Sequence, residues 1–280
     1  MKSATPEEVR HLLEFFELRG VSVVLSEELR RELNLRDYRE FHAYITQPQP
    51  DDEPIDFALS VGGDGTFLTT ASLIGSYNVP IVGINCGNLG FLADVQTKDV
   101  DLILDKLIRG QYIIEQRTLI NVRTSAAADI IPSPNALNEV AILKQSMSRM
   151  ISIETLVNGE PLTTYHADGL IIATPTGSTA YNLSVGGPLM VPQARGVILS
   201  PIASHSLGVR PLVIPDDWQL DLRIHSRNDN YMISIDGRSQ TLTSDVALHL
   251  MKAPYTIKVV QVGENSFINS LKNKLSWGQR

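Results

Sequence analysis

The stretch Phe57-Ala58-Leu59-Ser60-Val61-Gly62-Gly63-Asp64-Gly65-Thr66 decides how the first part of the chain folds. An apolar run of strand length ends in three glycines around one carboxylate, and an apolar helical pattern from Phe67 to Ile74 begins just after. Glycines let backbone N–H groups approach a polyanion closely, and the N-terminus of the helix adds the positive end of its dipole. The stretch therefore predicts a strand, an anion-binding loop and a helix.

Asp64 is an unusual residue for a loop that only binds phosphate, because its carboxylate repels phosphate. It fits a site in which it binds a sugar hydroxyl, takes a proton from that hydroxyl or holds a metal ion. The loop therefore indicates phosphoryl transfer. The alternative from these residues alone is a tight strand–helix turn with an aspartate cap.

Composition limits the classes of function. The 280 residues carry 24 Lys plus Arg against 31 Asp plus Glu, and this net charge of -7 argues against a nucleic-acid or membrane-surface partner. An acidic protein that handles phosphates must rely on backbone N–H groups, a few placed cations and Mg²⁺. Cys86 is the only cysteine, and no apolar run approaches membrane-spanning length. We therefore expect a cytoplasmic enzyme or binding protein.

The first 110 residues alternate between strand and helix patterns, which predicts a parallel sheet with helices on its faces. Ligands bind such sheets at the carboxyl ends of their strands. The expected helices are 5–19 (with Thr5 as N-cap), 27–35, 67–74 and 98–109, and the expected strands are 21–25, 57–61 and 80–84.

From about residue 111 onward, short alternating strands follow one another. Asn158-Gly159 lies between two apolar runs and predicts a tight hairpin. A short helical pattern at 178–184 interrupts the strands, and a helix or tail is expected at 264–278. The expected strands of this antiparallel sandwich are 150–157, 170–174, 219–225, 231–235 and 255–262.

A second candidate site is Thr174-Pro175-Thr176-Gly177-Ser178-Thr179-Ala180-Tyr181, directly after an apolar strand. Small hydroxylated residues, a glycine and a helix start form a pocket that hydrogen-bonds a polar ring edge; the alternative is a capped helix start. Asn138-Glu139, Asp168, His205 and Arg210 are further candidates, each also compatible with ordinary surface or turn chemistry. The six histidines show no close ligand spacing, so we expect no structural zinc site.

Together these segments resemble the NAD kinase family. The family is marked by a GGDGT loop, an Asn-Glu pair and a TPTGSTAY loop, which stand here in that order at Gly62–Thr66, Asn138-Glu139 and Thr174–Tyr181. Asn85-x-Gly87-x-Leu89-Gly90-Phe91-Leu92 and Gly186-Gly187-Pro188 also look like family segments, and the resemblance covers about residues 57–262. Family members usually begin with a strand and a small loop, whereas Met1-Lys2-Ser3 leads almost directly into the first helix, so we expect that strand to be absent here.

The resemblance implies an NAD kinase/diacylglycerol kinase-like fold. An α/β N-terminal domain (residues 1–110) and an all-β C-terminal sandwich domain (residues 111–262) would flank the active site. Residues 263–280 would form a C-terminal helix or tail that packs back on the α/β domain. The resemblance also implies a homodimer or homotetramer in which a neighbouring subunit completes the site, with no nucleic-acid or membrane partner.

The resemblance also implies roles for individual residues. Asp64, with Gly65 beside it, would be the base that takes the proton from the 2′-hydroxyl of the adenosine ribose of NAD. Asn138 and Glu139 would hold the adenine edge and ribose hydroxyls, and Asp168 the nicotinamide carboxamide. The adenine pocket would be lined by Thr179, Ala180, Tyr181, Asn182, Leu183 and Ser184. Ala203 would offer a backbone contact, and the residues near the dinucleotide phosphates or the second subunit's site would be Arg149, His166 and Arg238.

The implied reaction is ATP + NAD → ADP + NADP, with Mg²⁺ or another divalent cation and no metal-binding residues assigned. It requires mainly positioning and charge stabilisation, because phosphoryl transfer has a loose transition state. Two other functions remain open at this point. A lipid kinase would share the loop chemistry but should show an apolar groove and a basic or apolar membrane-facing patch. A non-enzymatic regulator would only bind NAD.

Overall fold

The computed structural model divides the chain into two compact units. The described residues are 5–46, 49, 52–87, 90–93, 95–96, 99–126, 130–145, 149–206, 208–263 and 267–276. One unit comprises residues 1–67 and 82–112, and the other comprises residues 68–81 and 113–280. The division falls inside helix α4 (Asp64–Ile74) and at the start of strand β4 (Ile81–Asn85). No helix in the described ranges is long and apolar enough to cross a membrane.

The first unit alternates strands and helices, which confirms the predicted α/β class. Strand β3 is a neighbour of β4, and β4 pairs in parallel with β5, so β4 and β5 end at the same edge. Besides α4 and β4, the elements are α1 (Pro6–Glu17), β1 (Val24–Leu25), α2 (Glu27–Glu32), β2 (Arg39–Glu40), α3 (Phe41–Thr46), β3 (Ala58–Gly62), β5 (Val95–Gln96) and α5 (Val100–Ile108).

Local sequence explains where α1 begins. The Thr5 side chain accepts from the N–H of Glu8, and the Glu8 carboxylate accepts from the N–H of Thr5, which satisfies two N–H groups that the helix leaves unpaired. Other boundaries differ from prediction. The strand expected at 21–25 shortens to β1, the helix expected at 27–35 ends at Glu32, and Asp64 is already helical rather than part of a loop. The expectation about Met1-Lys2-Ser3 lies outside the described residues.

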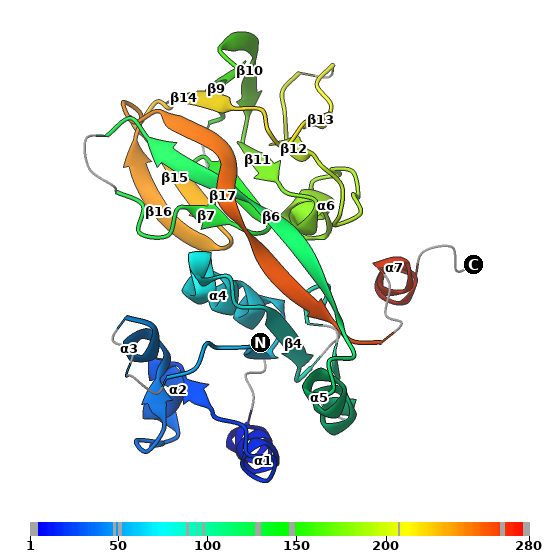
Figure 1. Ribbon diagram of the computed structural model, residues 1–280. Coiled ribbons are helices and arrows are strands. Elements are labelled where there is room, and N and C mark those ends of the chain that lie inside the picture. Colours follow the sequence, from blue (N-terminus) through cyan, green and yellow to red (C-terminus); the bar gives the residue numbers. More distant parts are fainter. Residues whose placement is uncertain are drawn as a thin grey trace. The chain divides into compact units, whose positions relative to one another are not determined.

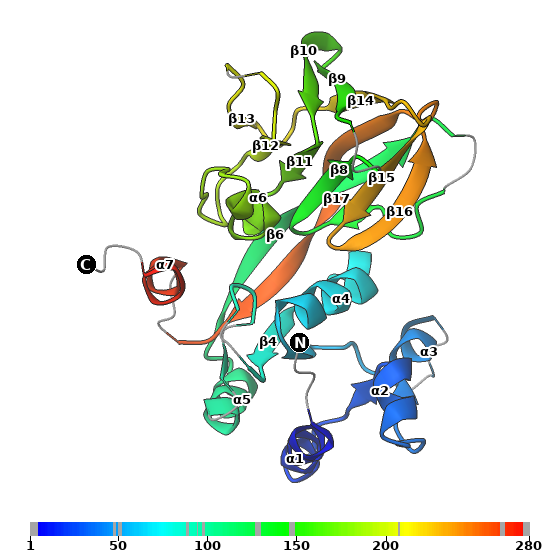
Figure 2. The same ribbon diagram turned by 180° about the vertical axis from the view of Figure 1, so that it is seen from behind.

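The second unit is a sandwich of two sheets, as predicted. In one sheet the strand order is β13-β12-β11-β8-β15-β16, and Figure 2 shows β8 between β11 and β15. These strands are β8 (Glu139–Leu143), β11 (Gly169–Ala173), β12 (Val197–Ile202), β13 (Leu212–Ile214), β15 (Asn230–Ile235) and β16 (Arg238–Thr243).

The other sheet of this unit has the order β10-β9-β14-β17, with β6 on β17 and β7 on β6. Figure 1 shows β6 (green) and β17 (orange) side by side along their length. The strands are β6 (Ile113–Thr124), β7 (Asn135–Ala136), β9 (Ile151–Val157), β10 (Glu160–Ala167), β14 (Leu220–His225) and β17 (Leu248–Gln261); the helices of this unit are η1 (Gly75–Tyr77), η3 (Thr176–Thr179), α6 (Tyr181–Ser184) and α7 (Phe267–Leu275).

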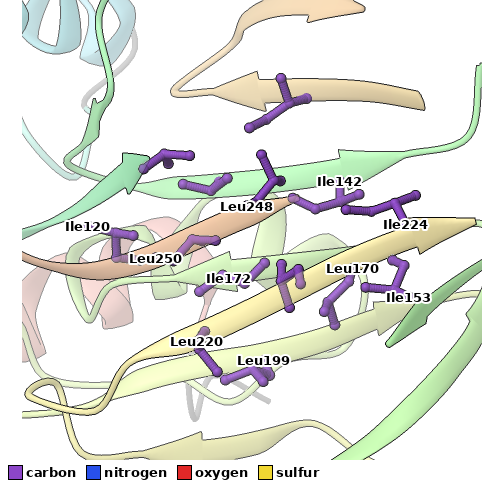
Figure 3. Packing of buried hydrophobic residues seen from close by; sticks show 14 of the residues in the cluster. Ile120, Ile142, Ile153, Leu170, Ile172, Leu199, Leu220, Ile224, Leu248 and Leu250 are labelled. Carbon is purple, nitrogen blue, oxygen red and sulfur yellow. The ribbon is translucent and has the colours of Figure 1, made fainter. Parts of the chain in front are cut away.

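The core of the sandwich lies between these two sheets (Figure 3). Ile142 and Ile172 come from one sheet, Ile153 and Leu250 come from the other, and all four are at most 2% exposed. Buried residues alternate with partly buried residues along β9 and with partly buried or exposed residues along β14, which fits strands with one face on this core. The packing fixes the register of the strands whose ends carry the candidate site residues, because a slip of one residue would turn each buried side chain outward.

The hairpin prediction is confirmed at Asn158-Gly159, where φ is 49° and 82° and the turn joins β9 to β10. The strand expected at 255–262 is only part of β17, and the helix expected at 178–184 is divided between η3 and α6. The expected C-terminal helix is present as α7, while residues 264–266 and 277–280 lie outside the described part. The domain boundaries at 110 and 262 stay a prediction.

Candidate active site

In the first unit, backbone donors surround the Asp64 carboxylate. Asp64 is the first residue of α4, and only Gly63 separates it from the end of β3. Its Oδ2 accepts from the N–H of Phe91 at 2.8 Å, and its Oδ1 accepts from the N–H groups of Leu92 at 3.0 Å and Ala93 at 3.2 Å. These donors lie between β4 and β5, so the segment that follows the neighbouring strand fixes the orientation of the carboxylate.

Gly90 makes this arrangement possible. A Cβ atom at Gly90 would lie 1.8 Å from Oδ1 and 2.4 Å from Cγ of Asp64. Such distances are far below van der Waals contact, so any other residue at position 90 must displace the carboxylate. Gly90 therefore has a steric role in the family segment that contains it.

We expect Gly90→Ala to lower kcat at least about 10-fold, because displacing a catalytic group by about 1 Å can cost as much as 10²-fold in rate. Steady-state assays of the phosphoryl transfer that the family resemblance implies measure this. Gly87→Ala is the matched control, since a Cβ there would meet only the Asn85 Oδ1 at 4.0 Å. Equal kcat for the two variants would show that the approach of Gly90 to Asp64 does not matter.

In the second unit, three strand ends bring the Asn138-Glu139 pair together with the start of the TPTGSTAY loop. Glu139 opens β8 and lies opposite Ala173, the last residue of β11, while Val140 lies opposite Ile235, the last residue of β15. The Thr174 N–H donates to the Asn138 carbonyl at 2.9 Å, and the Thr174 hydroxyl donates to the Leu137 carbonyl at 2.5 Å. The start of β8 and the ends of β11 and β15 therefore lie next to one another, and we call this place the Asn138 surface.

Buried polar atoms at this surface lack partners within the described part of the chain. They are Oδ1 of Asn138, Oε2 of Glu139 and Nε of Arg238. Leaving a buried donor or acceptor unpaired costs about 1–3 kcal/mol, so three such atoms in one place need an explanation. Two acceptors and one donor at the start of β8 suit a ligand with polar edges, such as a base or a sugar.

Burial raises the pKa of Glu139 from its ordinary value of 4.5 to about 7. The negative charge of Asp236 adds to this rise, and the N–H of Tyr181, which donates to the Glu139 carboxylate, opposes it. Near neutral pH the Glu139 carboxyl is therefore divided between its protonated and ionised forms, and it can both donate and accept hydrogen bonds.

This pKa has a consequence for stability. Because the folded pKa is raised, the contribution of Glu139 to stability is fully present below about pH 4.5 and is lost as the pH rises through about 7. The glutamine of Glu139→Gln cannot ionise. The Tm of the variant minus the Tm of the wild type should therefore be roughly 5 °C larger at pH 8 than at pH 5. Thermal unfolding at both pH values measures this. Glu160→Gln, at an exposed strand position, is the control, and its Tm difference from the wild type should be the same at both pH values. If the Tm difference of Glu139→Gln were also the same at both pH values, the assignment would be contradicted.

The TPTGSTAY loop packs directly on the Asn138 backbone. A Cβ atom at Gly177 would lie 2.1 Å from the carbonyl oxygen of Asn138 and 2.7 Å from its Cα. The Gly177 N–H donates to the Thr174 hydroxyl at 3.1 Å, which closes the loop on itself. The two segments that resemble family motifs are thus in backbone contact.

Residues 179–184 continue this loop into α6. Tyr181 is 39% exposed, Ser184 is also exposed, and Thr179, Ala180 and Leu183 are partly buried. Asn182 differs, because it is fully buried: its amide nitrogen donates to the Ser178 and Pro188 carbonyls, and its oxygen accepts from the Ser200 hydroxyl at 2.7 Å. The Asn182 side chain therefore holds the loop against β12.

A pocket of about 450 Å³ lies at the opposite end of β8 and β11. Lys144 and Asp168 form an ion pair in it, with 2.6 Å between Nζ and Oδ1, and the Ser152 hydroxyl lies 2.9 Å from Nδ1 of His166. Four basic side chains and one carboxylate make this pocket suited to an anionic ligand. The lining residues are Lys144, Arg149, Met150, Ile151, Ser152, His166, Asp168 and His205.

The structure therefore divides the predicted residues of the second unit between two places. Asn138, Glu139, Arg238 and the loop 179–184 lie around one end of β8, and Arg149, His166 and Asp168 lie at the other. Ala203, with φ 46°, follows β12 beside this pocket: the preceding Ile202 carbonyl accepts from Asp168, and the His205 N–H donates to the His166 carbonyl. Arg210 does not line the pocket.

Sequence reasoning missed two charged residues. Lys144 follows β8 with no motif around it and gave no signal. Asp236 does give a signal, because Asp-Gly between apolar runs indicates a hairpin turn, but this pattern does not indicate a second role. Its carboxylate accepts from the N–H groups of Leu137 at 2.7 Å, Asn138 at 2.8 Å and Glu139 at 3.1 Å.

Comparison with known proteins establishes the family of the chain. Residues 2–112 match the ATP-NAD kinase N-terminal domain, and residues 137–262 match the ATP-NAD kinase C-terminal domain. An NAD kinase of Flavobacterium psychrophilum is 36% identical over 284 residues, which cover 99% of this chain and 95% of the relative. The chain belongs to the NAD kinase family. A Bacteroides fragilis NAD kinase is 48% identical over 223 residues, covering 80% of this chain and 77% of the relative.

A solved NAD kinase structure supports the family assignment. An NAD kinase from Archaeoglobus fulgidus in complex with ATP matches 84% of this chain and 88% of its own, with a TM-score of 0.65 at 28% identity. The yeast NADH kinase complexed with NADH matches 100% of this chain and 86% of its own, with a TM-score of 0.85. At 24% identity, the yeast protein shows the fold alone.

Proposed function

We propose that this chain, as a member of the NAD kinase family, transfers the γ-phosphate of ATP to the 2′-hydroxyl of the adenosine ribose of NAD. The observation that carries the proposal is the geometry of Asp64. Its carboxylate lies at the N-terminus of α4, and three backbone N–H groups hold it in one orientation. A carboxylate oriented in this way is placed to take one proton in a fixed direction.

The reaction needs one proton transfer and one displacement. As the 2′-oxygen of NAD bonds to the γ-phosphorus, its proton passes to Asp64, and the bond between the γ-phosphorus and the β,γ-bridging oxygen breaks to release ADP. Gly65 follows Asp64 in the first turn of α4, where helix N–H groups and the dipole favour negative charge. Glycine at this position leaves the approach of phosphate oxygens unhindered.

The residues of the second unit would bind NAD. We assign the adenine edge and ribose hydroxyls to Asn138 and Glu139, because these side chains carry the unpartnered buried oxygens. Residues 179–184 would line the adenine pocket, with the exposed ring of Tyr181 available for stacking and Asn182 holding the loop in place. Arg238 would contribute its buried Nε to the same ligand.

We assign Mg²⁺ a place with the nucleotide. Among the described residues, no group of three or more His, Cys, Asp or Glu could hold a metal ion, which fits a cation held mainly by the phosphates of ATP. When bound there, Mg²⁺ would neutralise part of the phosphate charge. We further propose that the enzyme acts in the cytoplasm on small-molecule nucleotides, without a nucleic-acid or membrane partner.

The arrangement of the two ligand-binding places favours a homodimer or homotetramer. The Asp168 pocket and the Asn138 surface lie at opposite ends of the five-residue strands β8 and β11, a separation of about 17 Å. In an assembly, the pocket of one copy would face the Asn138 surface of another. Arg149 and His166 would then approach the phosphates, Asp168 the nicotinamide carboxamide, and the Ala203 backbone the same ligand.

An assembled site predicts that specific activity falls when the protein is diluted below its dissociation constant. Activity and light scattering measured over the same concentration series would check this. The fall in activity should follow the fall in molecular mass, because both report the loss of the partner copy. A fully active monomer at assay concentration would contradict the proposal.

A coupled assay for NADP on the purified chain tests the proposed function. NADP should form only when ATP, Mg²⁺ and NAD are all present. Diacylglycerol and sphingosine, offered as acceptors in place of NAD, should not be phosphorylated. Phosphorylated lipid would indicate a lipid kinase, and NAD binding by calorimetry without turnover would indicate a non-enzymatic regulator.

A further inference from the structure

Asp236 lies in the turn between β15 and β16, and its side-chain bonds reach a segment far away in sequence. Its two oxygens accept three N–H groups from Leu137, Asn138 and Glu139, which precede it by 97 to 99 residues. Two of these residues, Asn138 and Glu139, carry the buried side-chain oxygens that have no partner among the described residues. The carboxylate thus binds the backbone of the segment whose side chains face the ligand.

The backbone of residues 137–139 is held from both sides. Asp236 takes all three N–H groups. The carbonyls of Leu137 and Asn138 accept from the hydroxyl and the N–H of Thr174, and the Glu139 carbonyl accepts from the N–H of Asp236. Each N–H and each carbonyl of residues 137–139 thus has a hydrogen-bond partner. The backbone conformation of this segment is therefore set by Asp236 and Thr174 together.

The turn itself does not require a carboxylate. Asp236 and Gly237 have φ 47° and 81°, and the β9–β10 hairpin makes the same kind of turn with Asn158 and Gly159 at 49° and 82°. An amide therefore suffices for this backbone. Burial raises the pKa of Asp236, and the three N–H bonds and Arg238 oppose that rise, so keeping an ionised carboxylate here is costly. The geometry of the turn alone therefore does not explain why residue 236 is an aspartate.

We propose that Asp236 is a positioning residue for NAD, which acts by holding the backbone of Leu137–Glu139 so that the Asn138 and Glu139 side chains meet the ligand. The inference rests on the proposed function, because it assumes that these side chains bind NAD. It assigns Asp236 no contact with the reacting atoms. Its effect should therefore appear in the binding of NAD and not in the rate of the chemical step.

The test is Asp236→Asn, which keeps the turn and the size of the side chain. Two N–H groups can still bond to the amide oxygen, but the amide NH₂ then faces the remaining N–H donor. We expect KM and Kd for NAD to rise about 10-fold or more, with kcat within about 3-fold of wild type. Asp216→Asn is the matched control, because it removes another buried carboxylate, which pairs with Lys252 at 2.6 Å, whereas the N–H groups of residues 137–139 bond to Asp236. Its KM should be unchanged.

A double variant tests whether Asp236 acts through Asn138. In an Asn138→Ala background, Asp236→Asn should raise the Kd for NAD by much less than in the wild type. Full additivity, or a loss of kcat at saturating NAD with KM unchanged, would overturn the proposal. If Asp236→Asn fails to fold, hydrogen exchange of the wild-type protein tests the proposal instead. The backbone amides of Leu137, Asn138 and Glu139 should then be strongly protected from exchange in the absence of ligand. Fast exchange of these amides would overturn the proposal. A wild type that binds NAD but makes no NADP would refute the proposed function and leave these binding tests valid.

Discussion

Asp64→Asn is expected to lower kcat by about 10²–10⁴-fold while NAD still binds, because an amide cannot take the proton from the 2′-hydroxyl. The substitution preserves size and leaves an oxygen for two of the three N–H groups that hold the carboxylate. The loss should therefore come from the proton transfer more than from position. Initial rates at saturating ATP and NAD, together with the Kd for NAD from calorimetry, measure the two effects separately.

Asp105→Asn is a suitable control for this experiment. Asp105 belongs to the same unit and pairs with Arg19 at 3.1 Å on an exposed surface, where an ion pair contributes little. Its kcat should equal that of the wild type. If Asp64→Asn kept more than about a tenth of wild-type kcat, Asp64 would not be the base, and the reaction would have to rely on positioning alone.

Gly177→Ala is expected to raise KM for NAD by about 100-fold and to lower Tm by several degrees. The added Cβ would lie 2.1, 2.5 and 2.7 Å from the O, C and Cα atoms of Asn138, all of which belong to the backbone. Neither segment can give way cheaply, because Thr174 and Asp236 hold the Asn138 backbone. Overpacking of this kind costs about 1–3 kcal/mol, or more when the backbone must move.

Kinetics and thermal unfolding together check this expectation. The control is Gly208→Ala, because a Cβ at Gly208 would meet nothing within 4 Å. That variant should match the wild type in both KM and Tm. A Gly177→Ala protein with wild-type KM would mean that the contact between the loop and Asn138 does not shape the NAD site.

Local sequence patterns are sufficient to predict those parts of the structure that depend on residues close together in the sequence. The N-cap at Thr5 and the turn at Asn158-Gly159 follow from residue types a few positions apart, and both are predicted from the sequence; the return bond from Glu8 is seen only in the structure. The family resemblance was carried by short contiguous motifs for the same reason. Strand boundaries were less predictable, because β17 extends over 14 residues only by pairing with the distant β6.

The parts of the site that could not be predicted depend on contacts between distant segments. The bonds from Phe91, Leu92 and Ala93 to Asp64 join residues 27 to 29 positions apart, and no local pattern marks the donors because backbone N–H groups are common to all residue types except proline. Asp236 was hidden because its residue type already suited a turn. The roles of the individual site residues remain predictions that the experiments above address.

The pairing of β6 with β17 has a consequence for how the protein is made. Ile113 pairs with Gln261, which is synthesised 148 residues later. At about 5–20 residues per second, the ribosome delivers this partner roughly 7–30 s after Ile113 has been synthesised. During that interval the apolar residues of β6 lack their final neighbour and could pair with other unfinished chains. The pairing of β6 with β17 can therefore be completed only after residue 261 has been translated.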